Sequence, residues 1–310
     1  MTLSSQAIAR LKAALGDRLR ENTPLKGYTT AKIGGSATGL VIADTVTSLE
    51  QAVNACWQVE IPCKVLGNAS NVLISDHGFQ GVIIINRAKS IRFDLDQEPI
   101  TVKAGSGSNL GGLARQAALR GLSGLEWAAT VPGTVGGAVY GNAGAHGSDI
   151  QENLKMAEIL HPVKGKEWWT SGQLEYSYRS SVLKRTGSPA VILTAQFRLI
   201  QSTKEEVQAR METFNTRRRA TQPPGASMGS MFKNPSGDYA GRLIEAAGLK
   251  GQRIGGAEIS SMHANFIVNT EFATASDVYR LIRLAQEKVK EQSGIELELE
   301  IELIGEWDEI

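Results

Sequence analysis

The stretch VPGTVGGAVYGNAGAHG occupies residues 131–147, and it decides how the rest of the chain is interpreted. Glycine has no Cβ and tolerates positive φ, so a backbone with this many glycines can come very close to phosphate oxygens or to a flat ring. A tight buried loop between two strands is the alternative interpretation. The density of glycine beside Thr134 and Asn142 favours a backbone that faces a ligand.

Two loops of similar composition lie upstream, at residues 33–37 and 67–71, next to strand-like apolar segments. Neither is a Walker A loop or a G-x-G-x-x-G turn, so the two common nucleotide fingerprints are absent. Several separated loops of this kind predict a large phosphorylated cofactor that is held by many backbone contacts. The predicted cofactor contacts are Gly34, Gly35, Gly67, Asn68, Ala69, Ser70, Asn71, Pro132, Gly133, Thr134, Gly136, Gly137, Asn142 and Gly144.

Length and composition limit the classes of protein that fit. A chain of 310 residues predicts two or three domains, and 42% hydrophobic with 21% charged residues is ordinary globular composition. A formal net charge of +1 argues against a nucleic-acid-binding surface. Cys56 and Cys63 are the only cysteines, which predicts neither a disulfide framework nor a zinc site. Without a signal-like or membrane-spanning segment, we expect a soluble, cytoplasmic protein. We separately expect it to act as a monomer on a small-molecule substrate.

Apolar periodicity and capping residues predict an α/β chain. Thr47 to Glu50 and Thr203 to Glu206 each match a capping box at the start of a helix. Helices are predicted over 5–19, 47–59, 110–119, 203–219, 238–247 and 275–292, and strands over 40–43, 64–66, 82–85, 101–104, 191–199, 265–268 and 295–303.

Six motifs, in this order and spacing, give the chain a strong resemblance to one enzyme family. They are Gly67-Asn68-Ala69-Ser70-Asn71, Gly124-Leu125-Glu126, Val131 to Gly137, Tyr178-Arg179-Ser180-Ser181, Gly229 to Pro235, and Glu300 five residues before Gly305. From about Tyr28 to Gly305 the chain resembles the UDP-N-acetylenolpyruvoylglucosamine reductases, the MurB family.

The resemblance implies an α/β (α+β) architecture and an FAD-binding fold of the vanillyl-alcohol-oxidase (PCMH) type. It divides the chain into an N-terminal helical extension (1–27), two FAD-binding subdomains (28–86 and 87–200) and an α+β substrate-binding domain (201–310). It also implies noncovalent FAD, with NADPH as reductant. The implied reaction converts UDP-N-acetylglucosamine enolpyruvate to UDP-N-acetylmuramate for peptidoglycan synthesis.

The resemblance implies three catalytic residues, and each also has an ordinary structural explanation. Ser230 would donate the proton, although its local sequence alone is typical of a serine in a turn. Arg179 would hold the substrate carboxylate or enolate oxygen with its planar charged fork, although most loop arginines face solvent. Glu300 would assist at the reacting centre, although it is one of four glutamates that alternate with apolar residues over 295–303. Neighbouring carboxylates and desolvation are expected to raise its pKa.

Other candidates are less specific. Tyr178, Lys233 and Asn234 would bind the substrate nucleotide, while Arg217 to Arg219 fit the basic end of a helix slightly better than a diphosphate site. We assign no metal, and His263 is interpreted as structural. Ala69 replaces the glycine usual in relatives, and would cost roughly 1 kcal/mol if its φ is positive.

Two alternatives to the reductase remain. A flavin oxidase of the same superfamily would share the FAD-binding half but pass its electrons to oxygen. A nucleotide-sugar-binding protein could keep the fold without the chemistry. The Gly229 to Pro235 motif argues against the first, and the presence of Arg179, Ser230 and Glu300 together argues against the second.

Overall fold

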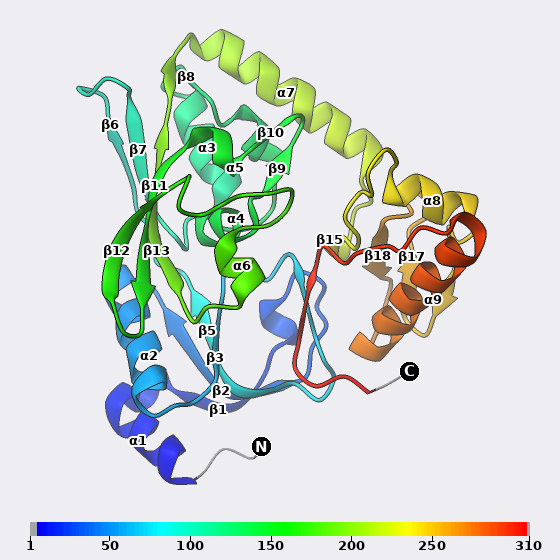
Figure 1. Cartoon of the computed structure of the whole chain (residues 1–310), viewed down its shortest axis with the longest axis horizontal. Helices are drawn as coiled ribbons and strands as arrows, with labels where there is room; N and C mark the ends of the chain where they lie inside the picture. The colour runs from blue at the N-terminus through cyan, green and yellow to red at the C-terminus, as the bar shows by residue number, and fades with distance from the viewer. Residues whose placement is uncertain (1–4, 309–310) are drawn as a thin grey trace.

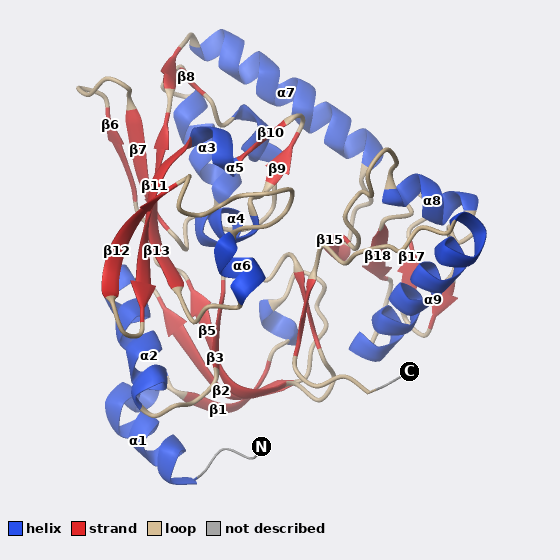
Figure 2. Cartoon of the chain, viewed as in Figure 1, coloured by secondary structure: helices blue, strands red, loops and turns tan. Residues whose placement is uncertain are grey.

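The computed structural model describes residues 5–308, in which three larger sheets of four, five and four strands carry the helices (Figures 1 and 2). In Figure 1 the first two sheets lie on the left, and the third lies on the right with helices α8 and α9. Among the described residues, no helix combines the length and hydropathy that crossing a membrane requires. The same residues contain no group of three potential metal ligands.

The first sheet has the strand order β1-β2-β5-β3. Its three last strands are parallel, and the run Val82 to Ile85 in β5 is buried throughout, as expected for a parallel strand that is covered on both faces. The antiparallel strand β1 was not predicted and lies within the segment 1–27, which is therefore not purely helical. The elements are α1 (Ser5–Leu15), β1 (Arg20–Pro24), β2 (Ser36–Ala43), α2 (Val46–Gln58), β3 (Cys63–Leu66) and β5 (Phe79–Asn86).

The capping box of α2 was predicted at the wrong residue. Thr45, not Thr47, precedes the helix, and its hydroxyl accepts a hydrogen bond from the Ser48 main-chain N–H at 3.0 Å. The Ser48 hydroxyl accepts in return from the Thr45 N–H, also at 3.0 Å. At the third helical position Ser48 therefore accepts the hydrogen bond from the N-cap N–H that the prediction had given to Glu50. Thr47 lies inside the first turn of the helix.

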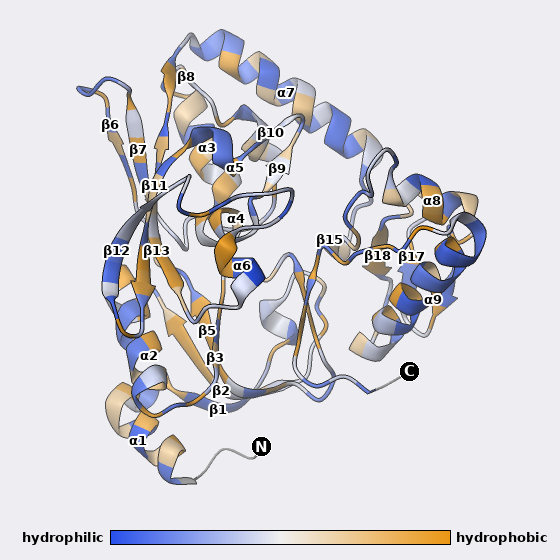
Figure 3. Ribbon diagram, in the orientation of Figure 1, coloured by the Kyte–Doolittle hydropathy of each residue, from blue (hydrophilic) through white to orange (hydrophobic). Residues whose placement is uncertain are grey.

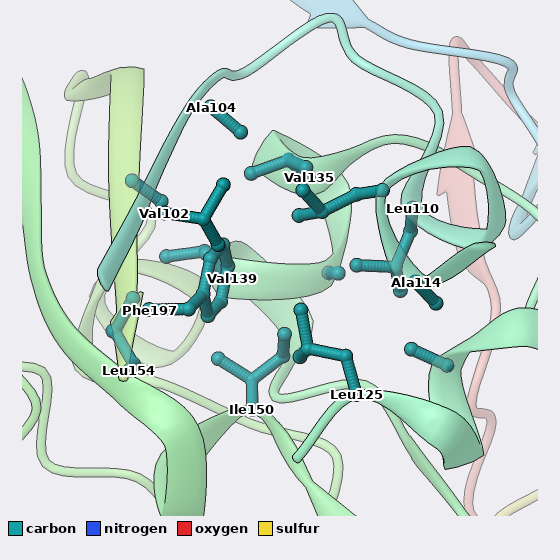
Figure 4. Close-up of a cluster of buried hydrophobic side chains, with 14 of the residues drawn as sticks. Val102, Ala104, Leu110, Ala114, Leu125, Val135, Val139, Ile150, Leu154 and Phe197 are labelled. Carbon is teal, nitrogen blue, oxygen red and sulfur yellow. The ribbon is translucent and has the colours of Figure 1, made fainter. Parts of the chain in front are cut away.

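The second sheet is antiparallel, with the order β12-β11-β13-β7-β6, and helices α3, α4 and α5 pack on it. Val102, Val139 and Phe197 lie in the buried cluster between sheet and helices (Figure 4). Only β7 and β13 were predicted. The elements are β6 (Ile91–Asp94), β7 (Thr101–Gly105), α3 (Leu110–Ala118), α4 (Val135–Gly141), α5 (Ile150–Asn153), β11 (Leu154–His161), β12 (Gly165–Thr170), α6 (Val182–Thr186) and β13 (Val191–Arg198).

Helix α7 (Lys204–Thr221) runs from the second sheet toward the third. Figure 3 shows it hydrophilic along most of its length, and its buried residues Val207 and Met211 join the core of the second sheet. Thr203 caps it as predicted, but the Glu206 carboxylate accepts from the Ser202 hydroxyl rather than closing a capping box. The start of this helix therefore packs on the second sheet, although it follows the predicted domain boundary at residue 201 in the sequence.

The third sheet has the order β15-β18-β17-β16 and is covered by α8 and α9. Helix α9 agrees with the prediction to within a residue, because both its ends carry strong signals. Thr274 and Asp277 form a capping box, and Gly294 ends the helix with a φ of 73°. The elements are β15 (Ala226–Ser230), α8 (Ala240–Ala246), β16 (Arg253–Ile254), β17 (Ala257–Ile259), β18 (Phe266–Asn269) and α9 (Ala275–Ser293).

The C-terminal segment differs from the strand predicted over 295–303. Only β19 (Glu302–Ile304) is a strand, and it pairs in parallel with β4 (Val72–Ile74), beside the first sheet. Leu297 and Ile301 are buried against the third sheet's core, so the apolar alternation is real but serves packing rather than a continuous ladder. Short pairs complete the fold: β8 (Leu122–Ser123) with β14 (Ile200–Gln201), and β9 (Gly144–Ala145) with β10 (Ser148–Asp149). The domain boundaries remain predictions.

Candidate active site

All three parts of the fold contribute to the wall of one cavity of about 1470 Å³. This volume exceeds the roughly 300–1,000 Å³ of ordinary small-molecule sites. The wall includes the loop 67–72, most of the run 131–147, and the side chains of Arg179, Ser230 and Glu300. In Figure 1 the elements α4, α6 and β15 surround the middle of the molecule, where these segments meet.

The middle of the glycine-rich run, Val135–Gly141, forms the short helix α4, and the residues on either side of it are not helical. Thr134 accepts from the Gly137 N–H at the start of α4, and Asn142 ends the helix in the left-handed region with a φ of 47°. A Cβ on Gly67 would lie 2.2 Å from the Thr134 Oγ1 atom, and one on Gly136 would lie 2.9 Å from the Ser106 Cβ. The predicted loops 67–71 and 131–137 therefore pack directly on each other and form one continuous wall, which we call the glycine wall.

Three of the predicted cofactor contacts, Gly34, Gly35 and Asn142, line neither this cavity nor the smaller second cavity described below. Gly34 and Gly35 lie elsewhere, and a Cβ on Gly35 would meet the Asp76 carbonyl oxygen at 2.2 Å, which explains this glycine without a ligand. Asn142 is buried, and its amide donates to Asp149 and to the Ser177 carbonyl. The structure therefore gives these three residues structural contacts, and the other eleven predicted contacts line the cavity.

Ala69, which stands where a glycine was expected, has the positive φ that is unfavourable for a residue with a Cβ. Its φ is 47°, and its side chain is buried. Its carbonyl accepts hydrogen bonds from the main-chain N–H and the hydroxyl of Thr30, at 3.4 and 3.2 Å. These bonds hold the backbone in the left-handed region despite the Cβ.

Arg179 and Glu300 form an ion pair on the cavity wall. The Arg179 Nε–H donates to the Glu300 Oε1 atom at 3.0 Å, and both side chains are mostly buried. Burial raises the pKa of Glu300, against the opposing effect of Arg179, Lys184 and Lys233. The pKa of Glu300 is raised as expected, but the cause is burial and not the neighbouring carboxylates.

Main-chain hydrogen bonds bring Ser230 and Glu300 to the same cavity. The Glu300 N–H donates to the Met231 carbonyl, and the Lys233 N–H donates to the Glu298 carbonyl, each at 2.8 Å. The Ser230 segment is held in turn by Asn265. Within residues 5–308 the Ser230 hydroxyl has no hydrogen-bond partner, so it is free to bind a ligand in the cavity.

The Asn265 amide makes a reciprocal pair with one residue of the Gly229 to Pro235 motif. Its oxygen accepts from the Phe232 N–H at 2.9 Å, and its NH₂ donates to the Phe232 carbonyl at 2.8 Å. His263 helps to hold Asn265 in place, because its Nδ1 atom accepts a hydrogen bond from the Asn265 N–H at 3.2 Å. His263 does not line the cavity. The structural interpretation of His263 fits these contacts.

A second cavity, of about 620 Å³, adjoins the first at Lys184 and Asn234, which line both. The predicted nucleotide ligands Tyr178, Lys233 and Asn234 all line it. Lys233 forms an ion pair with Glu298 at its edge.

Several residues of the cavity wall were not assigned a role from the sequence, among them Lys184, His146, Arg217 and Arg218. Lys184 was not singled out, His146 was given no role, and the run Arg217 to Arg219 was preferred as a helix end. Arg217 and Arg218 line the main cavity but Arg219 does not, and neither of the two has an ion-pair partner in the described part of the chain. The His146 ring stacks on Phe214 at 4.3 Å, and burial, followed by the two arginines, lowers its pKa.

Comparison with known proteins gives the site its chemical context. Family models match two segments: an FAD binding domain at residues 37–171, and the C-terminal domain of UDP-N-acetylenolpyruvoylglucosamine reductase at residues 221–304. The UDP-N-acetylenolpyruvoylglucosamine reductase of Bacillus pumilus is 42% identical over 297 residues, which cover 96% of this chain and 97% of that protein. The chain belongs to the UDP-N-acetylenolpyruvoylglucosamine reductase family.

Other relatives agree. The reductase of Bacillus subtilis is 42% identical and covers 97% of this chain and 98% of its own length. The crystal structure of the enzyme from Thermus caldophilus has a TM-score of 0.79 at 37% identity, covering 93% of this chain and all of that one. The expected fold class is confirmed, and the protein is a flavin-dependent oxidoreductase.

The residues present fit an FAD molecule. The glycine wall places four glycines on the cavity, Gly67, Gly133, Gly136 and Gly137, where the main chain has no side chain to cover it, and Gly133 adopts a φ of 121° beside Ser70. The unpaired charges of Arg217 and Arg218 suit phosphate oxygens. The cavity extends from these groups to Ser230 and Glu300, so a cofactor and a reacting substrate can share it.

Proposed function

We propose that the protein reduces UDP-N-acetylglucosamine enolpyruvate to UDP-N-acetylmuramate, with NADPH as reductant, in the cytoplasmic synthesis of peptidoglycan precursors. Family membership supports the substrate. The observation that carries the proposal is the meeting of Ser230 with the Arg179–Glu300 pair on a cavity that also has the glycine wall. Bound FAD would supply the hydride, taken from NADPH and delivered to the vinyl carbon of the substrate.

Arg179 would hold the substrate carboxylate as negative charge develops. Hydride addition to the vinyl group leaves charge that spreads into the adjacent carboxylate, and a fixed cation stabilises that state. Arg179 is held by the Glu300 carboxylate and rests 5.0 Å from the Tyr178 ring, so its guanidinium is oriented before substrate arrives. Gly144 makes room for it, since a Cβ there would lie 3.0 Å from the Arg179 Nη1 atom.

Ser230 would deliver the proton that completes the reduction. The product needs one hydride and one proton, placed on adjacent carbons. A hydroxyl is a weak acid, so it can protonate only a strongly basic carbanion and must then recover its proton. Glu300 lies on the same wall, and burial raises its pKa, which favours a protonated carboxyl group that could return a proton to Ser230.

Tyr178, Lys233 and Asn234 would bind the nucleotide part of the substrate in the second cavity. Asn234 and Lys184 lie where this cavity meets the first, so a substrate bound there can extend its enolpyruvyl group toward Ser230. The FAD contacts in this proposal are Gly67, Asn68, Ala69, Ser70, Asn71, Pro132, Gly133, Thr134, Gly136, Gly137 and Gly144.

Anaerobic mixing tests the proposal and separates it from its alternatives. The purified yellow protein is mixed with NADPH and then with the enolpyruvyl nucleotide sugar, while flavin absorbance is recorded. Bleaching by NADPH followed by recovery on addition of the sugar supports the reductase. Recovery only on admission of oxygen indicates an oxidase, and sugar binding without any recovery indicates a binding protein.

The proposed enzyme acts as a monomer on small molecules, without a nucleic-acid partner or a membrane-inserted segment. Light scattering coupled to gel filtration measures its mass directly. A mass near the 33.3 kDa of one chain agrees, and a mass of twice that value would replace the monomer by a dimer.

A further inference from the structure

Lys184 occupies the point where the two cavities meet, and the mechanism above gives it no role. Its Nζ atom donates to two main-chain carbonyls, that of Arg179 at 3.4 Å and that of Glu300 at 3.3 Å. These are the two residues whose side chains form the ion pair at 3.0 Å. One ammonium thus holds the backbone of both members of the pair.

The base of the Lys184 side chain is itself fixed. Ser181 precedes helix α6 and accepts from the Lys184 N–H at 3.3 Å, while its hydroxyl donates to the Tyr140 carbonyl at 2.6 Å. Leu183, next to Lys184, is buried in the core of the second sheet. The lysine therefore extends from a helix that is anchored to the end of the glycine-rich helix α4.

The two carbonyls come from segments that need such a link. Arg179 has a φ of 56°, a left-handed conformation that is costly for arginine without local support. Glu300 lies between the third sheet and β19, in a segment without regular secondary structure, and its carbonyl also accepts from the Asn71 side chain at 3.0 Å. Lys184 ties both segments to a helix of the second sheet.

Charged side chains of both signs act on Lys184. Lys233 is the cation, and Glu298, Glu300 and Glu302 are the anions. Burial, followed by Lys233, lowers its pKa, and the three carboxylates act in the opposite direction. For Glu300, the facing cations are Arg179, Lys184 and Lys233. Loss of the Lys184 charge would therefore remove one of three groups that favour the ionised carboxylate.

We propose that Lys184 is a positioning residue that fixes Arg179 and Glu300 against each other across two parts of the fold. It acts through their main chains and through its charge rather than by contact with the reacting atoms. The proposal rests on the proposed function for what the pair does, but not for how the pair is held.

The test compares Lys184→Met, Lys184→Arg and the control Lys166→Met in the FAD-loaded protein. Lys166 pairs with Glu50 on the exposed surface and lines neither cavity. In Lys184→Met we expect flavin reduction by NADPH to stay within about twofold, and reoxidation by the enolpyruvyl sugar to slow by about tenfold. Its pH profile should shift toward higher pH because the pKa of Glu300 rises. Lys184→Arg should keep the parent profile, and Lys166→Met the parent rate.

A purely structural lysine would change stability without moving the pH profile. Unchanged rate and profile in Lys184→Met, with the parent active, would overturn the proposal. Infrared titration of ¹³C-glutamate-labelled protein, with Glu300→Gln as the reference that identifies the Glu300 band, gives a readout independent of activity. A band midpoint that moves upward in Lys184→Met while the parent fails to reduce the sugar would refute the proposed function and retain the positioning role. An unmoved midpoint contradicts the positioning role in either case.

Discussion

Two regions of the main cavity are built in different ways. The glycine wall, residues 67–71 and 131–137, places four glycines on the cavity and comes from segments that pack directly on each other. The second region, which we call the charged wall, comprises Arg179, Lys184, Ser230 and Glu300 and presents side chains from segments far apart in sequence. Shape therefore dominates where a cofactor would bind, and charge dominates where a substrate would react.

The two walls also differ in how they are held. Because glycine has no Cβ, the two segments of the glycine wall can pack closely on each other, as they do at Gly67 and Thr134. The charged wall depends on long-range hydrogen bonds such as that from the Glu300 N–H to the Met231 carbonyl. A substitution in the first should therefore change cofactor affinity and stability, while one in the second should change a single half-reaction.

The largest effect is expected for Ser230→Ala. Reoxidation by the enolpyruvyl sugar should slow by on the order of a hundredfold or more, the contribution of a positioned proton donor, while flavin reduction by NADPH stays near the parent rate. Stopped-flow absorbance measures both halves. Equal slowing of both would show that the substitution disturbed the fold and that the walls are not independent.

Glu300→Gln should slow the same half-reaction by about ten- to a hundredfold. In the parent, reoxidation should be fastest at low pH and fall as the pH rises through the raised pKa of Glu300, because the protonated form is then lost. Glu296→Gln is the matched control, since Glu296 is exposed and pairs with Lys290. A parent rate that rises over that pH range, or control and test variants with equal rates, would remove Glu300 from the mechanism.

Gly67→Ala probes the glycine wall. The new Cβ would lie 2.2 Å from the Thr134 Oγ1 atom, so Thr134 must move and release its cap on α4. Overpacking of this kind costs about 1–3 kcal/mol, and we expect FAD affinity to fall roughly tenfold. Fluorescence titration with FAD and chemical denaturation measure the two effects. Normal FAD affinity with impaired substrate reduction would reverse the assignment of the walls.

The smallest effect is expected for Ala69→Gly. Relief of the left-handed strain is worth about 1–2 kcal/mol, and the greater freedom of glycine in the unfolded chain takes back about 0.4–1 kcal/mol. The free energy of unfolding should therefore rise by about 0.8 kcal/mol, the middle of the range that these two terms give. Ala114→Gly, in the interior of α3, serves as the control and should lower it by about 1 kcal/mol or more. A decrease at residue 69 would show that packing of the buried Ala69 methyl group contributes more than the left-handed conformation costs.

Local signals predicted the parts of the fold that local chemistry determines. Helix α9 has a capping box and a terminal glycine, and β13 alternates between apolar and polar residues over 193–198, so both were found. Strand β1 is polar and mostly exposed, so it carries no apolar pattern and was missed. The 295–303 segment alternates as a strand does, yet its partners are the third sheet's core and β4, which only the tertiary fold can select.

The candidate site shows the same limit. Motif residues Arg179, Ser230 and Glu300 were named from sequence, and the structure brings them to one cavity. Lys184 could not be found by spacing because its partners are carbonyl groups, one of them 116 residues away. Gly35 and Asn142 have the composition of ligand loops, but their close contacts are with the chain itself.

The most direct test of the account is the product of a single anaerobic turnover. Protein reduced with one equivalent of NADPH is mixed with one equivalent of the enolpyruvyl nucleotide sugar, and the quenched mixture is analysed by mass spectrometry. The account predicts conversion, in proportion to the flavin reoxidised, to a compound heavier by two hydrogen atoms that is identical to UDP-N-acetylmuramate. Unchanged sugar beside a flavin that stays reduced until oxygen is admitted would contradict it.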